Sequence, residues 1–368
     1  MTHLIEILRV AQPKLHGFER VVVWGGTSTL SVLDNQPWLD KRTYPALNKG
    51  LLRRTLWQRY GLSKAALDGG CDVLFVPGGS YAGNFHPVVT MSRNLLPFEM
   101  PELLRYGWSL FTLKLLLLRA IQSQSFRQAD GVIFLTNYAR EIVLKVTDKL
   151  RGQTCIIPHG YNSRFRIEPK LQRNIDEYND AHPYRVLYVS IIDQYKHQWH
   201  VVEAVAALRQ KGLPIVLDLV GPAYPPALKR LNQKIDLLDI DRRWVHYHGA
   251  IPFDELHLRY AEADLGLFAS SCENMPNILL ETMAAGLPVA SSKNGPMPEI
   301  LGDSGVFFNP TNFYDIATAL ERLIAHPRLR SALAEMSSFK VQKYSWETCA
   351  DQTFAFLAKV NQSWAEQQ

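Results

Sequence analysis

Short apolar runs alternate with longer stretches of helical periodicity along almost the whole chain. Continuous apolar strands separated by helices of roughly 10–20 residues indicate parallel sheets that are covered on both faces. We therefore predict an α/β protein with two doubly wound, Rossmann-like domains. The runs that we interpret as buried strands are RVVVW (20–24), DVLFV (72–76), VVTM (88–91) and GVIFL (131–135) in the first half, and RVLYVS (185–190), IVLDLV (215–220), VHYH (245–248), DLGLFA (264–269) and LPVASS (287–292) in the second.

The boundary between the domains is predicted in residues 159–183, which are polar, lack periodicity and end in a proline. We assign residues 1–165 to an N-terminal domain and residues 166–345 to a C-terminal domain. The last helix, 346–368, is expected to return to the N-terminal domain and complete it. A length of 368 residues suits two such domains.

Charge is distributed unevenly between the two halves. Residues 1–165 carry 20 Lys and Arg against 11 Asp and Glu, a net charge of +9, whereas residues 166–368 carry 20 against 24, a net charge of −4. The basic half is therefore the one expected to meet an anionic surface or acceptor. The four scattered cysteines indicate no disulfide framework, and the chain opens without a secretory signal pattern, so we expect a cytoplasmic protein.

The sequence lacks the motifs that are characteristic of several enzyme classes. The chain contains no G-x-G-x-x-G, no P-loop and no G-x-S-x-G sequence, which argues against a dinucleotide oxidoreductase, an NTPase and a hydrolase of the serine-elbow class. The D-x-D at 239–241 is predicted to lie at the end of a helix and to be a solvated turn. With no cluster of ligands at metal spacing, we predict no metal site and no cofactor.

The stretch SSCENMPNILLETMAAGLPVASS (270–292) carries the strongest chemical signal. Pro276 suits the first turn of a helix and Gly286 its end, so we predict a helix over about 276–285 that follows a strand. Its N-terminus then lies where ligands bind in parallel sheets and offers N–H groups to a phosphate. Glu281 in that helix and Glu273 before it are placed to accept hydrogen bonds from sugar hydroxyls.

The same stretch, continued by GPMPEIL (295–301), resembles the signature of the family-4 retaining glycosyltransferases, which have the GT-B fold. This resemblance implies two Rossmann-like domains facing a central cleft, with a nucleotide-sugar bound by the C-terminal domain without a metal. It implies that Glu273 contacts the donor sugar and Glu281 the ribose. Backbone contacts to the sugar and phosphate fall on Asn274, Met275, Pro276, Asn277 and Ile278, and those to the base on Gly249, Ala250 and Ile251.

A second match lies in YVSIIDQYKHQWH (188–200), where Lys196 stands at the start of a predicted helix. A lysine there suits a diphosphate leaving group, because negative charge develops on it as the bond breaks. By this resemblance the catalytic residues are Lys196 and Glu273. The family's arginine, five or six positions before the lysine, is replaced by Ser190 and Ile191, and His197 or the helix amides are candidates to compensate.

The acceptor side matches the family less well, because the first strand and Gly-rich loop of its N-terminal domain are not recognisable. The weaker candidates on this side are Gly78, Gly79, Asn94 and His159. We interpret His86 as structural. The segment 102–128 mixes Trp, Leu and basic residues; we interpret it as a helix that covers the sheet, the alternative being an interfacial helix on an anionic membrane.

These observations predict a retaining transferase that moves a sugar from a nucleotide-diphosphate-sugar to an acceptor hydroxyl. A saccharide or lipid-linked acceptor in envelope polysaccharide or lipopolysaccharide assembly is expected. The alternatives are a non-catalytic or partner-dependent nucleotide-sugar-binding protein, and a nucleotide-sugar epimerase of the same fold.

Overall fold

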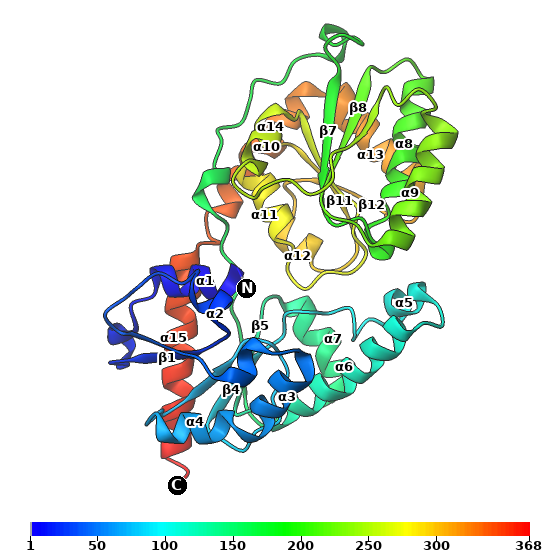
Figure 1. Ribbon diagram of the computed structural model, residues 1–368. Helices are drawn as coiled ribbons and strands as arrows, with labels where there is room; N and C mark the ends of the chain where they lie inside the picture. Colours follow the sequence, from blue (N-terminus) through cyan, green and yellow to red (C-terminus); the bar gives the residue numbers. More distant parts are fainter. Residues whose placement is uncertain (1) are drawn as a thin grey trace. The chain divides into compact units, whose positions relative to one another are not determined.

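The computed structural model describes residues 2–368, which form two compact units (Figure 1). The first unit comprises residues up to 98, residues 108–160 and residues 344–368, and the second comprises residues 99–107 and 161–343. The chain therefore passes to the second unit five residues earlier than predicted, after Gly160 and not after Phe165. Residues 99–107, which the sequence analysis placed in the N-terminal domain, also belong with the second unit.

The second unit is built on six parallel strands in the order β12-β11-β10-β7-β8-β9. The first strand of this unit along the chain, β7, is central, and the chain adds strands first on one side of it and then on the other. Such an order places a switch point at the carboxyl ends of β7 and β10. The strands are β7 (Tyr184–Val189), β8 (Ile215–Val220), β9 (Val245–Tyr247), β10 (Leu265–Phe268), β11 (Val289–Ser292) and β12 (Val306–Phe308).

Helices connect these strands and cover the sheet of the second unit (Figure 1). In α8 the side chains of Val201, Val202 and Val205 are fully buried, which fixes the face that the helix presents to the core. The helical elements are α5 (Met100–Leu103), η3 (Leu104–Tyr106), η4 (Ser163–Phe165), η5 (Ile175–Glu177), η6 (Gln194–Lys196), α8 (Gln198–Gln210), α9 (Pro225–Leu238), α10 (Leu256–Glu262), α11 (Asn277–Ala284), α12 (Met297–Leu301), α13 (Phe313–Ala325) and α14 (Pro327–Val341).

The first unit contains two parallel sheets, a four-stranded one in the order β3-β4-β5-β6 and a separate pair, β1-β2. Its last helix, α15, packs against α1. The strands are β1 (Val21–Trp24), β2 (Leu39–Arg42), β3 (Leu74–Val76), β4 (Val88–Met91), β5 (Gly131–Phe134) and β6 (Gln153–Ile156). The helical elements are α1 (Thr2–Val10), η1 (Pro13–His16), α2 (Thr27–Leu30), η2 (Pro45–Asn48), α3 (Leu51–Tyr60), α4 (Leu62–Asp68), α6 (Leu110–Gln128), α7 (Asn137–Thr147) and α15 (Trp346–Ala365).

All nine apolar runs form strands, with ends within two residues of the predicted ones, and both units are α/β with parallel sheets as predicted. Three strands were not predicted, because two of them lack a continuous apolar run and the third has an apolar run of only three residues. These are β2 (LDKR), β6 (QTCI) and the three-residue β12 (VFF). No helix in residues 2–368 has the length and apolarity that crossing a membrane requires.

Candidate functional site

Two predicted site residues meet at the carboxyl ends of adjacent strands in the second unit. Lys196 follows β7 and Glu273 follows β10, and these strands pair with each other. The Lys196 ammonium and the Glu273 carboxylate form an ion pair, with side chains only 7% and 15% exposed. The structure thus joins an opposite-charge pair that is 77 residues apart in the chain, at the switch point of the sheet.

The loop after β7 holds the lysine in a fixed position. The Asp193 carboxylate accepts a hydrogen bond from the backbone N–H of Gln194 (2.7 Å) and caps η6, and the Tyr188 hydroxyl donates to the Lys196 carbonyl (2.8 Å). Nζ of Lys196 lies 5.0 Å from the centroid of the Tyr195 ring and 5.2 Å from that of Phe268. Two aromatic faces and one carboxylate therefore surround the ammonium.

Helix α11 begins one residue later than predicted, at Asn277, with Pro276 as the preceding cap residue. It ends at Ala284, and Gly286 takes the left-handed conformation (φ 63°) that allows the chain to turn away. The amide oxygen of Asn277 is buried and has no hydrogen-bond partner within residues 2–368. Because an unpaired buried polar atom is costly, the start of α11 has unused capacity for a polar ligand.

Glu281 lies inside the second unit and not on a solvated edge of α11. Its side chain is 6% exposed, and the Tyr260 hydroxyl donates a hydrogen bond to Oε2 (3.3 Å). Burial raises the pKa of this carboxyl from 4.5 to about 8. The group is therefore held largely protonated near neutral pH, and hydroxyl donors from a ligand would favour its ionised form.

Residues 99–107 contact the loops that carry Lys196 and Glu273. The Ser271 hydroxyl donates to a Glu102 carboxylate oxygen (2.6 Å), and the Tyr106 hydroxyl donates to Asp193 (2.7 Å). Arg105 donates two hydrogen bonds to Glu102 (2.7 and 3.1 Å). Sequence reasoning missed these residues, because nothing in the local sequence indicates that a segment of the N-terminal half docks on the other unit.

His197 does not replace the absent arginine of the family pattern with a positive charge. Burial, followed by the nearby Arg105 guanidinium, lowers the pKa of His197 to about 3, so the imidazole is neutral. Its Nε2 hydrogen-bonds with the Ser271 hydroxyl (2.9 Å). The two positions that stand in place of the arginine are joined by Gln198, whose amide donates to the Ser190 hydroxyl and the Ile191 carbonyl (2.9 Å each).

The predicted base-binding residues, Gly249, Ala250 and Ile251, follow the edge strand β9. The Gly221 N–H donates to the Gly249 carbonyl (2.8 Å) and ties this loop to the end of β8. Gly249 has φ of 67°, and a Cβ added to it would meet nothing within 4 Å. Its backbone is therefore open to a flat ligand group, in a conformation that favours glycine.

The weaker acceptor-side candidates all follow parallel strands of the four-stranded sheet in the first unit. Gly78 and Gly79 follow β3, Asn94 follows β4 and His159 follows β6, so the structure brings them to one edge of the sheet. Asn94 closes a turn by accepting from the backbone N–H of Leu96 (3.2 Å). His86, at the opposite end of β4, hydrogen-bonds with Asp130 (2.6 Å), in line with a structural role.

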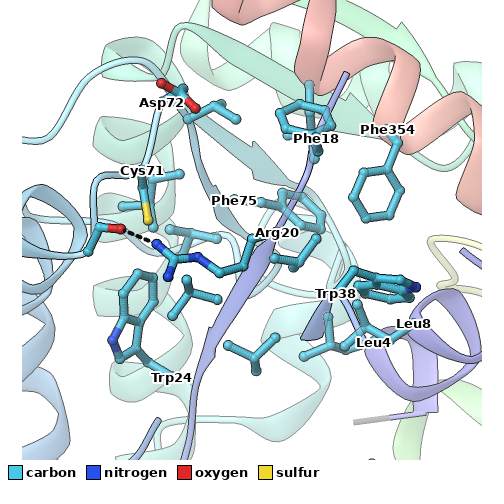
Figure 2. Close-up of a pocket in the computed structure, with 18 of the residues that line it drawn as sticks. Leu4, Leu8, Phe18, Arg20, Trp24, Trp38, Cys71, Asp72, Phe75 and Phe354 are labelled. Carbon is cyan, nitrogen blue, oxygen red and sulfur yellow. Dashed lines mark hydrogen bonds between the residues drawn. The ribbon is translucent and has the colours of Figure 1, made fainter. Parts of the chain in front are cut away.

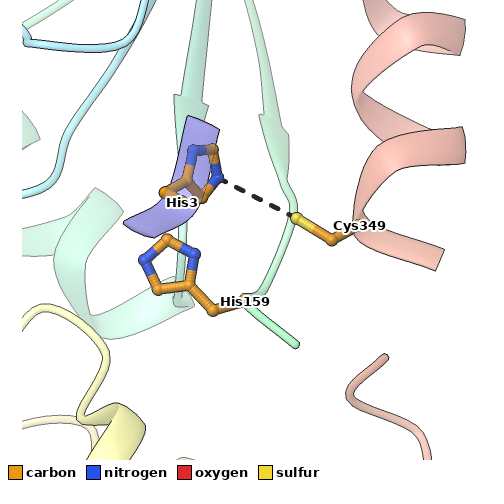
Figure 3. Close-up of side chains that lie close together, drawn as sticks. All are labelled: His3, His159 and Cys349. Atoms are coloured by element: carbon orange, nitrogen blue, oxygen red, sulfur yellow. Dashed lines mark hydrogen bonds between the residues drawn. The ribbon is translucent and has the colours of Figure 1, made fainter. Parts of the chain in front are cut away.

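Two groups of side chains could hold a metal ion, and neither has a recognisable sequence spacing. One is His3, His159 and Cys349, which are buried in the first unit (Figure 3); the other is Asp218, His246 and His248 in the second. Burial lowers the pKa of His3 to about 3, so its imidazole stays neutral. The D-x-D at 239–241 lies at the end of α9 as predicted, but the prediction of a solvated turn is wrong at Asp239: its buried carboxylate accepts hydrogen bonds from three backbone N–H groups, of Arg243, Trp244 and Val245 (2.8–2.9 Å).

Part of the second unit is similar to a known protein family. Residues 183–326 match the family described as Glycosyl transferases group 1. The O-antigen chain mannosyltransferase B of Escherichia coli is 28% identical over 60% of the chain and 56% of its own length. A GDP-mannose-dependent alpha-(1-6)-phosphatidylinositol monomannoside mannosyltransferase of Mycolicibacterium smegmatis is 26% identical over 66% of the chain and 64% of its own length. The chain thus spans less than two thirds of these relatives.

The fold is shared with solved glycosyltransferase structures. The sucrose-phosphate synthase of Thermosynechococcus elongatus superimposes with a TM-score of 0.74 at 18% identity, covering 96% of the chain and 92% of that protein. At this identity the likeness shows the fold alone. Together, the two comparisons lead to one conclusion: residues 183–326 resemble the group 1 glycosyltransferases, and the chain has the GT-B fold of the solved structures.

Proposed function

We propose that the protein is a retaining glycosyltransferase that moves a hexose from a nucleotide-diphosphate-sugar to an acceptor hydroxyl. The observation that carries this proposal is the buried Lys196–Glu273 pair at the switch point of the donor-side sheet. The two named mannosyltransferases make GDP-mannose the first donor to test, and an acceptor in envelope polysaccharide or lipopolysaccharide assembly follows the same relatives.

In this proposal the donor separates the two charges. The diphosphate takes the Lys196 ammonium as its partner, which releases the Glu273 carboxylate to accept hydrogen bonds from the sugar hydroxyls. The bond between the anomeric carbon and the phosphate oxygen breaks, and the acceptor oxygen bonds to that carbon on the same face. The acceptor proton passes to the leaving phosphate oxygen, so no protein nucleophile is needed. Lys196 stabilises the charge that develops on the diphosphate.

A thermal-shift panel of UDP, GDP, ADP, CMP and their common sugar conjugates tests the donor side. We expect one base to stabilise the wild type by about 2.7 kcal/mol at a hundred times its Kd. Glu281→Ala should lose about 1–3 kcal/mol of that binding energy, because ligand hydroxyls are left unpaired. Glu262→Ala is the matched control, since Glu262 is an exposed carboxylate that pairs with Arg259 on the surface.

The two alternative functions are distinguished by incubating the protein with the nucleotide-sugar that stabilises it and analysing the products. A nucleotide-sugar that stabilises the protein without transfer or slow hydrolysis would indicate a binding protein. Interconversion of sugars without an acceptor would indicate an epimerase. If no nucleotide shifts the melting temperature of the wild type, the proposed donor site is wrong.

We also propose that the first unit binds an anionic membrane surface through α3 and the start of α6. Helix α3 exposes Leu51 (68%), Leu52 (80%) and Leu56 (56%), buries no residue and carries three arginines without an acidic residue. In α6 the exposed apolar residues stand at helical spacing, among them Leu110, Leu113 and Leu117, while the opposite side contributes to the core. The helix predicted over 102–128 is therefore shorter, at Leu110–Gln128, and one side of it is buried in the first unit while the other presents an apolar stripe.

Co-sedimentation with vesicles tests the membrane proposal. We expect binding to phosphatidylcholine vesicles that contain phosphatidylglycerol, weakening as salt is raised. Replacing Arg53 and Arg54 by alanine should cost about 2 kcal/mol, at about 1 kcal/mol per basic residue near the surface. Leu52→Glu should reduce binding further, whereas Leu237→Glu, at a leucine of α9 in the second unit that is 67% exposed, should not. Equal losses in Leu52→Glu and Leu237→Glu would contradict the assignment.

A further inference from the structure

A cavity of about 850 Å³ separates the two sheets of the first unit (Figure 2). It is lined by all four residues of β1 and all three residues of β3, so the two strands face each other across it. The Arg20 guanidinium donates to the Gly69 carbonyl (2.8 Å), which ties the residue before β1 to the end of α4. Helices α1 and α15 contribute apolar side chains to the lining, among them Leu4, Leu8 and Phe354.

The strand order of the second unit indicates which element lies between the counterparts of β1 and β3. There the order β9-β8-β7-β10-β11-β12 places the first strand of the unit, β7, between β8 and β10. The first unit has the order β2-β1, then the cavity, then β3-β4-β5-β6. The two orders coincide when β2 and β1 correspond to β9 and β8, and when β3, β4 and β5 correspond to β10, β11 and β12. The position of β7 then falls on the cavity.

Backbone groups on both sides of the cavity lack strand partners. Val21 donates to the residue before β2 and Leu74 to the residue before β4, so these residues face their paired strands. In a parallel strand alternate residues face opposite neighbours, so Val22, Trp24 and Phe75 face the cavity. Within residues 2–368 no loop or helix carbonyl accepts from their N–H groups. The buried indole N–H of Trp24 has no partner among these residues either.

Strand β1 is also less buried than its apolar sequence would lead one to expect. All four residues of β1 (VVVW) are only partly buried, whereas all six residues of β8, its counterpart in the second unit, are buried. A continuous apolar run is typical of a strand with neighbours on both sides and covered faces. A two-stranded parallel pair standing apart from the main sheet is therefore an incomplete arrangement.

Helix α1 identifies the direction from which a strand would enter. In the second unit, β7 leads through α8 to β8, as in a right-handed parallel crossover. In the first unit α1 leads to β1 in the same way. The His3 ring, at the start of α1, lies 4.6 Å from that of His159, just after the end of β6 (Figure 3). The helix thus begins at the carboxyl edge of the sheet, where a preceding parallel strand ends.

We propose that the cavity is a strand position. Its occupant is an extended, mainly apolar segment of about five residues that precedes Thr2 in a longer form of this polypeptide. The segment pairs in parallel with β1 on one side and β3 on the other, and joins the two sheets into one seven-stranded sheet. This inference rests on the fold of the first unit and is independent of the proposed transfer reaction.

A pair of proline substitutions tests whether the edge of β1 is open. Val22→Pro removes an N–H that faces the cavity, and Val23→Pro removes one that faces β2. In the 368-residue chain we expect Val23→Pro to lower Tm by about 6 °C or more and Val22→Pro to lower it far less. Equal losses, together with amides of Val22 and Phe75 that exchange as slowly as those of β8, would show that no strand position is open.

The occupant is tested on the polypeptide isolated from the cells that make it, by intact mass and hydrogen–deuterium exchange. We expect residues upstream of Met1, with the amides of Val22, Trp24 and Phe75 protected as in β7 and β8. In that form Val22→Pro should be as destabilising as Val23→Pro. A polypeptide that starts at Met1 would overturn the proposal. So would protection that depends on protein concentration, which indicates a second copy, or protection that appears only with decanoic acid, which indicates an apolar ligand.

Discussion

Lys196→Ala is expected to lower turnover by about 10²–10³-fold while changing donor affinity much less. The ammonium is proposed to act on charge that develops on the diphosphate as the glycosidic bond breaks, and loss of one such preorganised donor typically has this effect. A steady-state and single-turnover comparison with the wild type separates the two quantities. When no acceptor is supplied, turnover is measured as the rate of slow donor hydrolysis.

The substitution also leaves the Glu273 carboxylate without its partner at a site where it is only 15% exposed. A loss of about 3 kcal/mol in the free energy of unfolding is therefore expected as well, as for other ion pairs broken on one side. The matched control is the double variant Lys196→Ala/Glu273→Gln, which should recover stability without recovering turnover. If turnover and donor affinity fall by the same factor, Lys196 only binds the donor and the proposed role in catalysis is wrong.

Glu281→Gln is expected to raise the free energy of unfolding at pH 8 by about 2–4 kcal/mol in the absence of ligand. The pKa of this carboxyl is about 8 in the folded protein and 4.5 in the reference state. Between these values the folded chain keeps a proton that the unfolded chain has lost, so wild-type stability falls as pH rises from 4.5 to 8. Glutamine does not titrate, so the stabilisation should be much smaller at pH 5. Thermal or denaturant unfolding at the two pH values measures it.

The same residue should make donor binding depend on pH. Ribose hydroxyls donate to the ionised carboxylate, so binding at pH 6 includes the cost of removing the proton. Affinity for a nucleotide-sugar should then tighten by about 10- to 50-fold between pH 6 and pH 8 and level off above the free pKa. A nucleotide-sugar is the right probe, because its diphosphate has no terminal phosphate that titrates in this range. A flat profile in the wild type, or an equal slope in Glu281→Gln, would contradict the ribose assignment.

Sequence patterns predicted those elements that are determined by neighbouring residues in the chain. The strands before Lys196 and Glu273 and the turn at Gly286 follow from apolar runs and from a residue that tolerates positive φ. Their positions in parallel strands suffice to predict that both charged residues lie at one edge of a sheet. The ion pair between them is a further consequence of β7 and β10 being neighbours, which no local pattern encodes.

The features that were missed depend on contacts between distant segments. Glu281 stands in an ordinary helical sequence, and its high pKa follows from burial beside Tyr260, a residue of another helix. The docking of Glu102 onto Ser271 joins residues 169 positions apart. Strand β2 was missed because three of its four residues are charged, and such a strand is recognised only by the neighbour with which it pairs.

Helix α15 belongs to the first unit although it follows the whole of the second unit along the chain. As the chain leaves the ribosome, the first unit cannot close its core until residues 344–368 have emerged, after the whole of the second unit has been synthesised. Domains otherwise tend to fold in order from the N-terminus. The second unit depends in turn on residues 99–107 of the earlier part of the chain. Loss of residues 344–368 is therefore expected to leave the first unit partly built with apolar surface exposed, and this unit completes its fold only after the second unit has been synthesised.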